Sequence, residues 1–291
     1  MFGCQSWEEA ESVLQKEAVS MAIGKAELEN WQIRTIYVGD LLAQTIASSF
    51  GIIGFDTPVY GLYGACATMG EALSLSSMSV AAGYGDYVVA VTSSHFGSAE
   101  KEFRFPLGYG NQRPLSATWT VTGSGACVLG TKGGKARITG ITTGKIIDFG
   151  LKDSLNMGAC MAPAAADVIY NHLNDFGTAP DDYDKIITGD LGYVGQAILI
   201  DLLKRKGIDI SKVHMDCGIE MFDKENQDTH SGGSGCGCSA TVLTSYVFKQ
   251  LKKKAWKKIL FIPTGALMSP ISFNQGKSVP GIAHLVVIES V

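Results

Sequence analysis

The sequence of 291 residues contains no apolar run that approaches the ~20 residues needed to span a bilayer. Its first residues, MFGCQSWEEAESV, lack the basic segment and the following apolar segment of a signal peptide. Basic residues are not in excess, because 24 Lys and Arg stand against 28 Asp and Glu, which gives a net charge of −4. This balance argues against nucleic acid as the main partner. We therefore expect a cytoplasmic protein with no signal peptide, no transmembrane helix and no nucleic-acid partner.

The seven cysteines do not form a disulfide pattern, because their number is odd and their spacing irregular. The segment HSGGSGCGCSA holds His230, Cys236 and Cys238, which are three potential zinc ligands. A structural zinc ion takes four, usually as two Cys pairs, and no second pair is present. The glycines of this segment do not form a dinucleotide-binding Gly-x-Gly-x-x-Gly after a strand. We expect neither a metal nor a cofactor.

The most informative feature is an internal duplication. The segments IYVGDLLAQTIASSFG (36–51) and IITGDLGYVGQAILID (186–201) both read as an apolar strand, then Gly-Asp-Leu, then a helix. Further downstream, the buried strand YVVAVTSSH corresponds to KILFIPTGA, and a Gly/Cys turn opens a helix in both copies. Short apolar runs alternating with helical patterns are typical of sheets covered by helices. We predict two similar α/β halves, residues 1–150 and residues 151–291.

The two halves are not matched at their beginnings. In the second half the strand ARITGITT (136–143) precedes the helix that leads to Asp190, whereas nothing comparable precedes the helix at 7–28. We therefore expect the first half to lack its opening strand.

Several motifs occur in one order along the chain: GDLLAQ, YGACATMGEA, TVTGSGACVLG, MAPAAADV, TGDLGYVG, GGSGCGCSA and TGALMSP. From about residue 7 to residue 291 the sequence resembles the stage V sporulation protein AD family, within the thiolase and ketoacyl-synthase superfamily. The resemblance implies a thiolase-like fold, in which two duplicated α/β halves form a layered α-β-α-β-α sandwich. It also implies a homodimer that forms through the sheet of the first half.

Cys66 lies between a predicted strand and a predicted helix, in YGACATMG. A thiol at a helix N-terminus is close to the positive end of the helix dipole, which favours the nucleophilic thiolate. Condensing enzymes of the superfamily carry their acyl group as a thioester at this position. The alternative is a small buried side chain, because free cysteine is among the most buried residue types.

The base and the oxyanion donors of those enzymes are absent from the matching segments. Where type III synthases have His-Gln-Ala-Asn, this chain has Gly189-Asp190-Leu191-Gly192, and Cys236 replaces the second donor. An ionised carboxylate only accepts hydrogen bonds and would repel an oxyanion. We therefore expect the condensing machinery to be dismantled in this sequence. His284, on an apolar strand, is either a substitute base or an ordinary core histidine.

Three further segments allow more than one interpretation. The insertion 144–165 could cover the pocket with Asp148, and Arg104 and Arg113 in an earlier insertion suit carboxylate groups. The run KQLKKKAWKKIL (249–260) is either the solvated end of a helix or a docking site for anionic lipid or a membrane partner. We expect His172 and His214 to be exposed.

The resemblance implies a non-catalytic sporulation protein that binds dipicolinic acid, or calcium dipicolinate, for uptake into the developing spore. It further implies association with membrane proteins of the same operon, peripherally at the spore inner membrane. The ligand-binding candidates are Cys66, Asp148, Asp190, Cys236 and His284. The alternatives are a ketoacyl-synthase-like acyltransferase in which Cys66 is the acyl-accepting nucleophile, and a structural subunit with a vestigial pocket.

Overall fold

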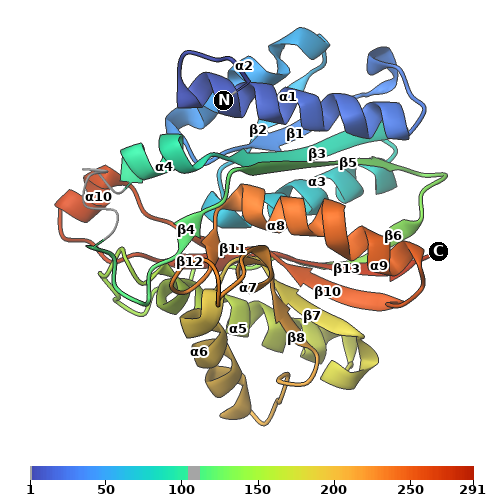
Figure 1. The fold of residues 1–291 in the computed structure, drawn as a ribbon. Coiled ribbons are helices and arrows are strands. Elements are labelled where there is room, and N and C mark those ends of the chain that lie inside the picture. The colour runs from blue at the N-terminus through green and yellow to red at the C-terminus, as the bar shows by residue number, and fades with distance from the viewer. Residues whose placement is uncertain (1, 104–111) are drawn as a thin grey trace.

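A computed structural model describes residues 2–103 and 112–291. Two mixed sheets lie one above the other, with helices between and outside them (Figure 1). The first sheet has the order β2-β1-β3-β5, with β1 (Ile36–Gly39), β2 (Val59–Gly61), β3 (Tyr87–Ser94) and β5 (Gly123–Gly130). The second has the order β6-β13-β10-β7-β8, with β6 (Ala136–Thr142), β7 (Lys185–Thr188), β8 (His214–Asp216), β10 (Lys258–Ile262) and β13 (Leu285–Ser290). Two short ribbons pair β4 (Trp119–Thr120) with β9 (Gly233–Ser234) and β11 (Thr264–Ala266) with β12 (Gly281–Ala283).

The helices form three layers around these sheets. The α-helices are α1 (Trp7–Lys25), α2 (Ile46–Ile52), α3 (Thr68–Ala81), α4 (Phe96–Phe103), α5 (Met157–Phe176), α6 (Gly192–Lys204), α7 (Cys217–Met221), α8 (Cys236–Val242), α9 (Phe248–Lys252) and α10 (Pro270–Asn274). Helix α1 packs on β3 and β5, and α5 and α6 cover the other face of the molecule (Figure 1). Helices α3 and α8 lie between the two sheets and share one apolar core with both. The layered α-β-α-β-α fold predicted from the sequence is confirmed.

The duplication is visible in the strand order. In each half a parallel pair, β1 with β3 and β7 with β10, is followed by an antiparallel partner, β5 or β13. In the second half β6 covers the outer edge of β13, whereas no described residue forms a strand on that edge of β5. The first sheet therefore has four described strands and the second has five. Because β6 belongs to the second sheet, the chain changes sheets between Gly130 and Ala136, ahead of the expected boundary at residue 150.

Of two histidines that we expected to be exposed, one is buried and the other is partly buried, so that prediction was wrong. His172 is fully buried on α5, where its ring contacts the hydroxyls of Thr142 at 2.8 Å and Tyr183 at 2.9 Å. His214 begins β8, and its ring contacts the hydroxyl of Thr188 at 3.0 Å. Burial lowers the pKa of each imidazole to about 4, because the charged form loses its hydration.

Among residues 2–103 and 112–291, no helix combines the length and the hydrophobicity needed to cross a membrane. The same residues contain no cluster of three or more His, Cys, Asp or Glu side chains that could hold a metal ion.

Candidate functional site

Cys66 lies in a tight turn of 3-10 helix, Ala65–Ala67, directly before α3. Ala65 has a left-handed backbone with φ of +50°, which a residue with a side chain adopts at a cost. The hydroxyl of Thr68 closes the turn, because it accepts from the Gly64 amide at 3.0 Å and donates to the Ala65 carbonyl at 2.6 Å. The turn that presents Cys66 is therefore held by its own hydrogen bonds.

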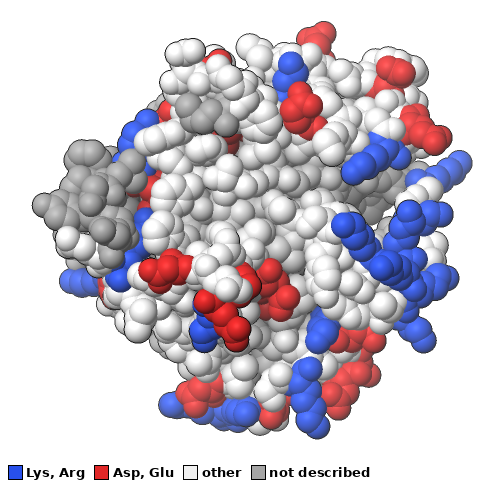
Figure 2. Space-filling view, in the orientation of Figure 1, with Lys and Arg blue, Asp and Glu red and all other residues white. Residues whose placement is uncertain are grey.

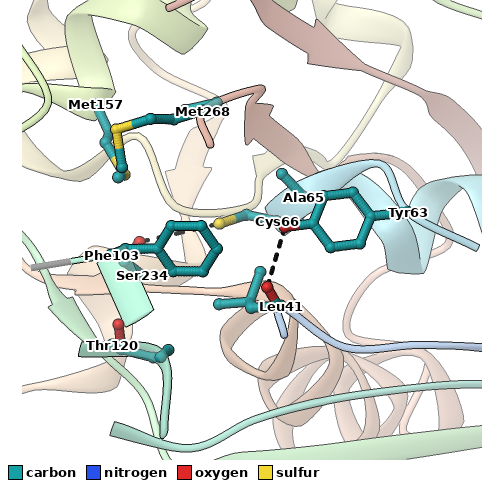
Figure 3. Close-up of a pocket in the computed structure, with 11 residues that line it drawn as sticks. Leu41, Tyr63, Ala65, Cys66, Phe103, Thr120, Met157, Ser234 and Met268 are labelled. Atoms are coloured by element: carbon teal, nitrogen blue, oxygen red, sulfur yellow. Dashed lines mark hydrogen bonds between the residues drawn. The ribbon is translucent and has the colours of Figure 1, made fainter. Parts of the chain in front are cut away.

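Cys66 faces a pocket of about 400 Å³, part of which is open to solvent (Figure 3). The lining is mainly apolar, with Phe103 lying in front of the thiol and Met157 and Met268 next to each other at one side. The Tyr63 hydroxyl donates to the Leu41 carbonyl at 3.0 Å and is thereby oriented. The described lining residues are Leu41, Tyr63, Ala65, Cys66, Ala99, Phe103, Thr120, Met157, Ser234, Ala266 and Met268, and none of these is a lysine, arginine or histidine.

Behind the pocket wall, Asp190 lies close enough to Cys66 for its negative charge to raise the pKa of the thiol. Asp190 follows β7 and is fully buried, and one of its carboxyl oxygens accepts from the Gly235 amide at 2.8 Å and from the Ser234 hydroxyl at 3.2 Å. Its second oxygen accepts from the Thr264 hydroxyl at 2.9 Å. The Ser234 hydroxyl lies 4.0 Å from the Cys66 sulfur. The structure thus brings together Cys66 from the first half and Asp190 from the second.

The electrostatics of Cys66 differ from the sequence-based expectation. Burial raises the pKa of the thiol well above its ordinary value, and the negative charge of Asp190 raises it further. A helix N-terminus stabilises a negative charge by about 0.3–2 kcal/mol. Full burial shifts a pKa by up to ~3–5 units, and each unit corresponds to ~1.4 kcal/mol. Desolvation therefore outweighs the helix dipole, and the expectation of a favoured thiolate was wrong.

Asp190 holds its proton more tightly than an ordinary aspartic acid. Burial raises its pKa to about 7, although its hydrogen bonds from Gly235 and Thr264 act in the opposite direction. Among the described residues, the hydrogen-bond donors to its carboxyl group are one amide and two hydroxyls, and none of them is a cation. As a carboxylate, Asp190 cannot donate a hydrogen bond to an oxyanion.

Cys236 has the corresponding place in the second half, at the start of α8. It packs in one small cluster with Cys66, Leu41 and Ala99, and its thiol donates to the Ser93 carbonyl at 2.9 Å. Burial raises its pKa, and the charges of Cys66 and Asp40 add to the effect. Each cysteine is therefore influenced by the Gly-Asp-Leu aspartate of the opposite half. Cys236 lies beneath the pocket and does not line it.

The structure does not bring the two other candidates into the described pocket lining. Asp148 is exposed, and its carboxylate accepts from the Gly150 amide at 2.8 Å and the Ser278 hydroxyl at 2.6 Å. His284 is partly buried between the β12 and β13 strands, and its Nδ1 accepts from the Gly144 amide at 3.3 Å. Burial lowers the pKa of His284.

The two arginines of the earlier insertion have different outcomes. Arg104 lies outside the described residues. Arg113 is buried and forms an ion pair with Glu100, and its guanidinium lies 4.3 Å from the centre of the Trp119 ring. Glu100 also accepts from the Thr120 hydroxyl at 2.9 Å, which connects this ion pair to the pocket wall.

Sequence reasoning missed part of the site. Ser234 lies within the GGSGCGCSA segment, but in that segment Cys236 was the residue predicted to bind ligand, and Ser234 was not. Phe103, Met157 and Met268 are far apart in the sequence, and no periodic pattern marks them as neighbours. Their common position depends on how the two halves pack.

Comparison with known proteins identifies relatives over nearly the whole chain. A family model described as Stage V sporulation protein AD matches residues 1–289. The Stage V sporulation protein AD of Bacillus subtilis (strain 168) is 42% identical over 285 residues, which cover 98% of this chain and 84% of that protein.

Two solved structures share the fold at low identity. OleA from Xanthomonas campestris has a TM-score of 0.63 at 12% identity and covers 96% of this chain and 81% of its own. The 3-oxoacyl-[acyl-carrier-protein] synthase III from Aquifex aeolicus has a TM-score of 0.58 at 14% identity and covers 96% and 84%.

Proposed function

Because this chain belongs to the stage V sporulation protein AD family, we propose that it is a non-catalytic sporulation protein whose pocket binds dipicolinic acid, as the calcium chelate, for uptake into the developing spore. The observation that carries the proposal is the pairing of Cys66 with Asp190. The fold keeps the position of the acyl-accepting thiol, while its neighbour raises the pKa of that thiol instead of removing its proton. A pocket with an unactivated thiol is suited to binding and not to condensation.

The lining of the pocket favours the chelate over the free dianion. Dipicolinate is a flat aromatic ring with two carboxylates, and its ring can contact Phe103, Tyr63 and the two methionines. The described lining residues carry no positive charge that could pair with two carboxylates. A buried unpaired charge costs several kcal/mol or is neutralised, whereas the one-to-one calcium chelate is neutral as a whole. The hydroxyls of Ser234 and Thr120 are the polar groups that would orient it.

The proposal includes the partners that go with uptake. We place the protein peripherally at the spore inner membrane, in association with membrane proteins of the same operon. We also propose a homodimer, for which the exposed outer edge of β2 is the supporting feature. Val59 and Tyr60 on this edge strand are 50% and 52% exposed, and β2 has β1 as its described partner on one side alone. An exposed apolar edge strand is a template for pairing with a second strand.

The test is isothermal titration calorimetry with dipicolinate, in the presence and absence of an equimolar amount of calcium. We expect saturable one-to-one binding that is tighter with calcium and is weakened in Cys66→Ala and in Ser234→Val. The matched control is Cys127→Ala, because Cys127 is also a buried cysteine but does not line the pocket. Thermal unfolding of every variant verifies that it is folded.

Two results would contradict the proposal. A flat titration of folded wild-type protein, with and without calcium, removes the binding function and leaves a structural subunit. A covalent adduct on Cys66 after incubation with acyl-CoA, absent from Cys66→Ala, establishes the ketoacyl-synthase-like acyltransferase instead. Mass spectrometry of the intact protein distinguishes these cases.

A further inference from the structure

One end of the molecule carries a concentration of positive charge that the sequence shows only in part. It is formed by eight exposed cations, which we call the basic end: Lys132, Lys135, Arg137, Lys249, Lys252, Lys253, Lys254 and Lys257. Figure 2 shows these side chains gathered at the side of the molecule where α9 and the C-terminus lie in Figure 1. The chain as a whole has a net charge of −4, so the charge distribution is strongly asymmetric.

The fold joins two segments that are more than a hundred positions apart in the sequence. The last strand, β13, lies between β6 and β10, so that Arg137, Glu289 and Lys258 are side by side across three strands. The Val291 amide donates to the Lys135 carbonyl at 3.2 Å, and the Ser290 amide donates to the Lys257 carbonyl at 2.8 Å. Helix α9 packs against β6 and β13. The lysines at 249–257 and those of the turn between β5 and β6, Lys132 and Lys135, therefore belong to one continuous surface.

Few acidic groups oppose this charge. Glu289 pairs with Arg137 at 3.3 Å and with Lys258 at 3.7 Å, at the border of the basic end. The Asp184 carboxylate accepts from the backbone amides of Lys257 and Lys258 at 2.6 and 3.0 Å. Within the described part of the chain, none of the seven lysines of the basic end has a carboxylate within ion-pair distance.

An aromatic pair lies beside the lysines. Tyr246 is 41% exposed, and its ring meets Trp256 edge-on at a centroid distance of 5.7 Å. Trp256 in turn packs against the core between the sheets. Rings that are apolar on one side and polar on the other are favoured at the headgroup level of a bilayer.

We propose that the basic end docks the protein onto a membrane surface that contains anionic lipid headgroups. A field of lysines without arginine forks gives diffuse electrostatic attraction, which suits a fluid anionic surface better than a defined phosphate or carboxylate ligand. The single arginine is engaged by Glu289. Each lysine close to such a surface raises the binding constant about fivefold, so that the patch is sufficient for reversible peripheral attachment.

The position of the basic end also defines an orientation. The pocket is lined in part from α4, which lies on the side of the molecule opposite to α9 (Figure 1). Docking through the basic end leaves the pocket mouth open to the aqueous side. This inference rests on the proposed peripheral location and is independent of which ligand the pocket takes.

The experiment is co-sedimentation of the full chain with vesicles of phosphatidylcholine, with and without phosphatidylglycerol, over a series of salt concentrations. The test variant combines Lys252→Gln, Lys253→Gln and Lys254→Gln. The control combines Lys204→Gln, Lys206→Gln and Lys212→Gln, which removes the same charge from exposed lysines at the end of α6 and in the connection from α6 to β8. Dipicolinate titration of both variants separates failure of docking from failure of the pocket.

We expect binding to the anionic vesicles alone, with a loss at high salt because exposed charges are screened. The test variant should bind about tenfold more weakly or worse, and the control should bind like the wild type. Absence of binding to anionic vesicles, or an equal loss in the control, overturns the proposal. Tighter binding to double-stranded DNA or polyglutamate than to the vesicles, at the same ionic strength, overturns it in favour of another polyanion.

Discussion

The charge of Asp190 raises the pKa of the Cys66 thiol, and the two residues come from different halves of the duplicated chain. Cys236 and Asp40, their counterparts in the duplication, are also close enough for the charge of one to affect the other. The aspartate of each half therefore acts on the cysteine of the other half. In both cases the charge of the aspartate raises the pKa of the thiol. A cysteine at the start of α3 is therefore not by its position alone an activated nucleophile.

The first prediction concerns the reactivity of Cys66. In Asp190→Asn the negative charge next to the thiol is absent, so the pKa of Cys66 should fall toward its ordinary value. A fall of one unit raises the thiolate fraction about tenfold below the pKa. We expect a similar increase in the rate of alkylation by iodoacetamide at pH 8. Peptide mass spectrometry follows Cys66, in a Cys4→Ser background that removes the partly exposed thiol.

Asp40→Asn is the matched control for that prediction. Asp40 is also a buried carboxylate after a Gly, but its charge acts on Cys236 and is not among the main causes of the raised pKa of Cys66. The Cys66 rate should therefore remain that of the wild type. An unchanged or slower rate in folded Asp190→Asn would show that burial alone keeps the thiol protonated.

The order of elements was predictable from the sequence, whereas the electrostatics of the site was not. Alternating apolar segments and the repeated Gly-Asp-Leu motif are local patterns, and they correctly placed Asp40 and Asp190 after equivalent strands β1 and β7. The pKa of Cys66 depends on what surrounds the turn in three dimensions, and that is decided by packing between the halves. A helix N-terminus is visible in a sequence, but the depth at which it is buried is not.

Asp148 illustrates a second limit. The insertion that contains it does lie beside the chain segment after α10, as the Ile147–Gly281 bridge shows. Its carboxylate is nevertheless held at the surface by Gly150 and Ser278. The position of an insertion can be predicted, but the direction of one side chain in it depends on partners that are distant in the sequence.

The second prediction concerns stability against pH. Glu11 on α1 is fully buried with Ser93 and Ser98 as hydrogen-bond partners, and burial raises its pKa to about 8 from an ordinary 4.5. The folded state therefore binds this proton more tightly than the unfolded state. The resulting stabilisation is complete below pH 4.5 and is lost as the pH rises to 8.

Glu11→Gln lacks this titration, so its free energy of unfolding should fall less than that of the wild type between pH 5 and pH 8. The difference between the two proteins should be roughly 3 kcal/mol, from ~1.4 kcal/mol per unit of pKa shift. Urea denaturation at both pH values measures it. Glu17→Gln, an exposed change on the same helix, should reproduce the wild-type slope. Parallel curves for Glu11→Gln and the wild type would refute the assignment.

The third prediction concerns the homodimer. In a twofold pairing of β2 with its copy, each residue i of the strand faces a residue j of the other strand and j faces i, so Val59→Lys would put two lysines of like charge into one short interface. We expect a dimer for the wild type and a shift to monomer for this variant, measured by size-exclusion chromatography with light scattering. Ile271→Lys on α10 changes an even more exposed apolar residue away from β2 and should remain dimeric. A monomeric wild type at high concentration would exclude the dimer.

The last prediction concerns the contact that holds the Cys66 turn in place. Gly265 in β11 lies against that turn, and a Cβ atom at this position would come within 2.3 Å of the Gly64 carbonyl oxygen and 3.0 Å of the Ala67 amide. Both neighbours are backbone atoms, so the strain cannot be relieved by a side-chain rotation. Gly265→Ala should therefore destabilise the protein by about 1–3 kcal/mol, as overpacking does elsewhere. It should also weaken binding in the pocket, because the displaced turn carries Cys66.

Gly24→Ala is the opposite case within the same chain. Gly24 lies inside α1, and a Cβ atom there would meet nothing within 4 Å. Alanine should stabilise this helix by about 0.5–1 kcal/mol, because it reduces the conformational freedom lost on folding. Urea denaturation compares the two variants, and calorimetric titration compares their pockets. If Gly265→Ala were as stable as Gly24→Ala and bound ligand equally well, β11 would not position the turn, and the geometry of Cys66 would depend on the internal hydrogen bonds of Thr68 alone.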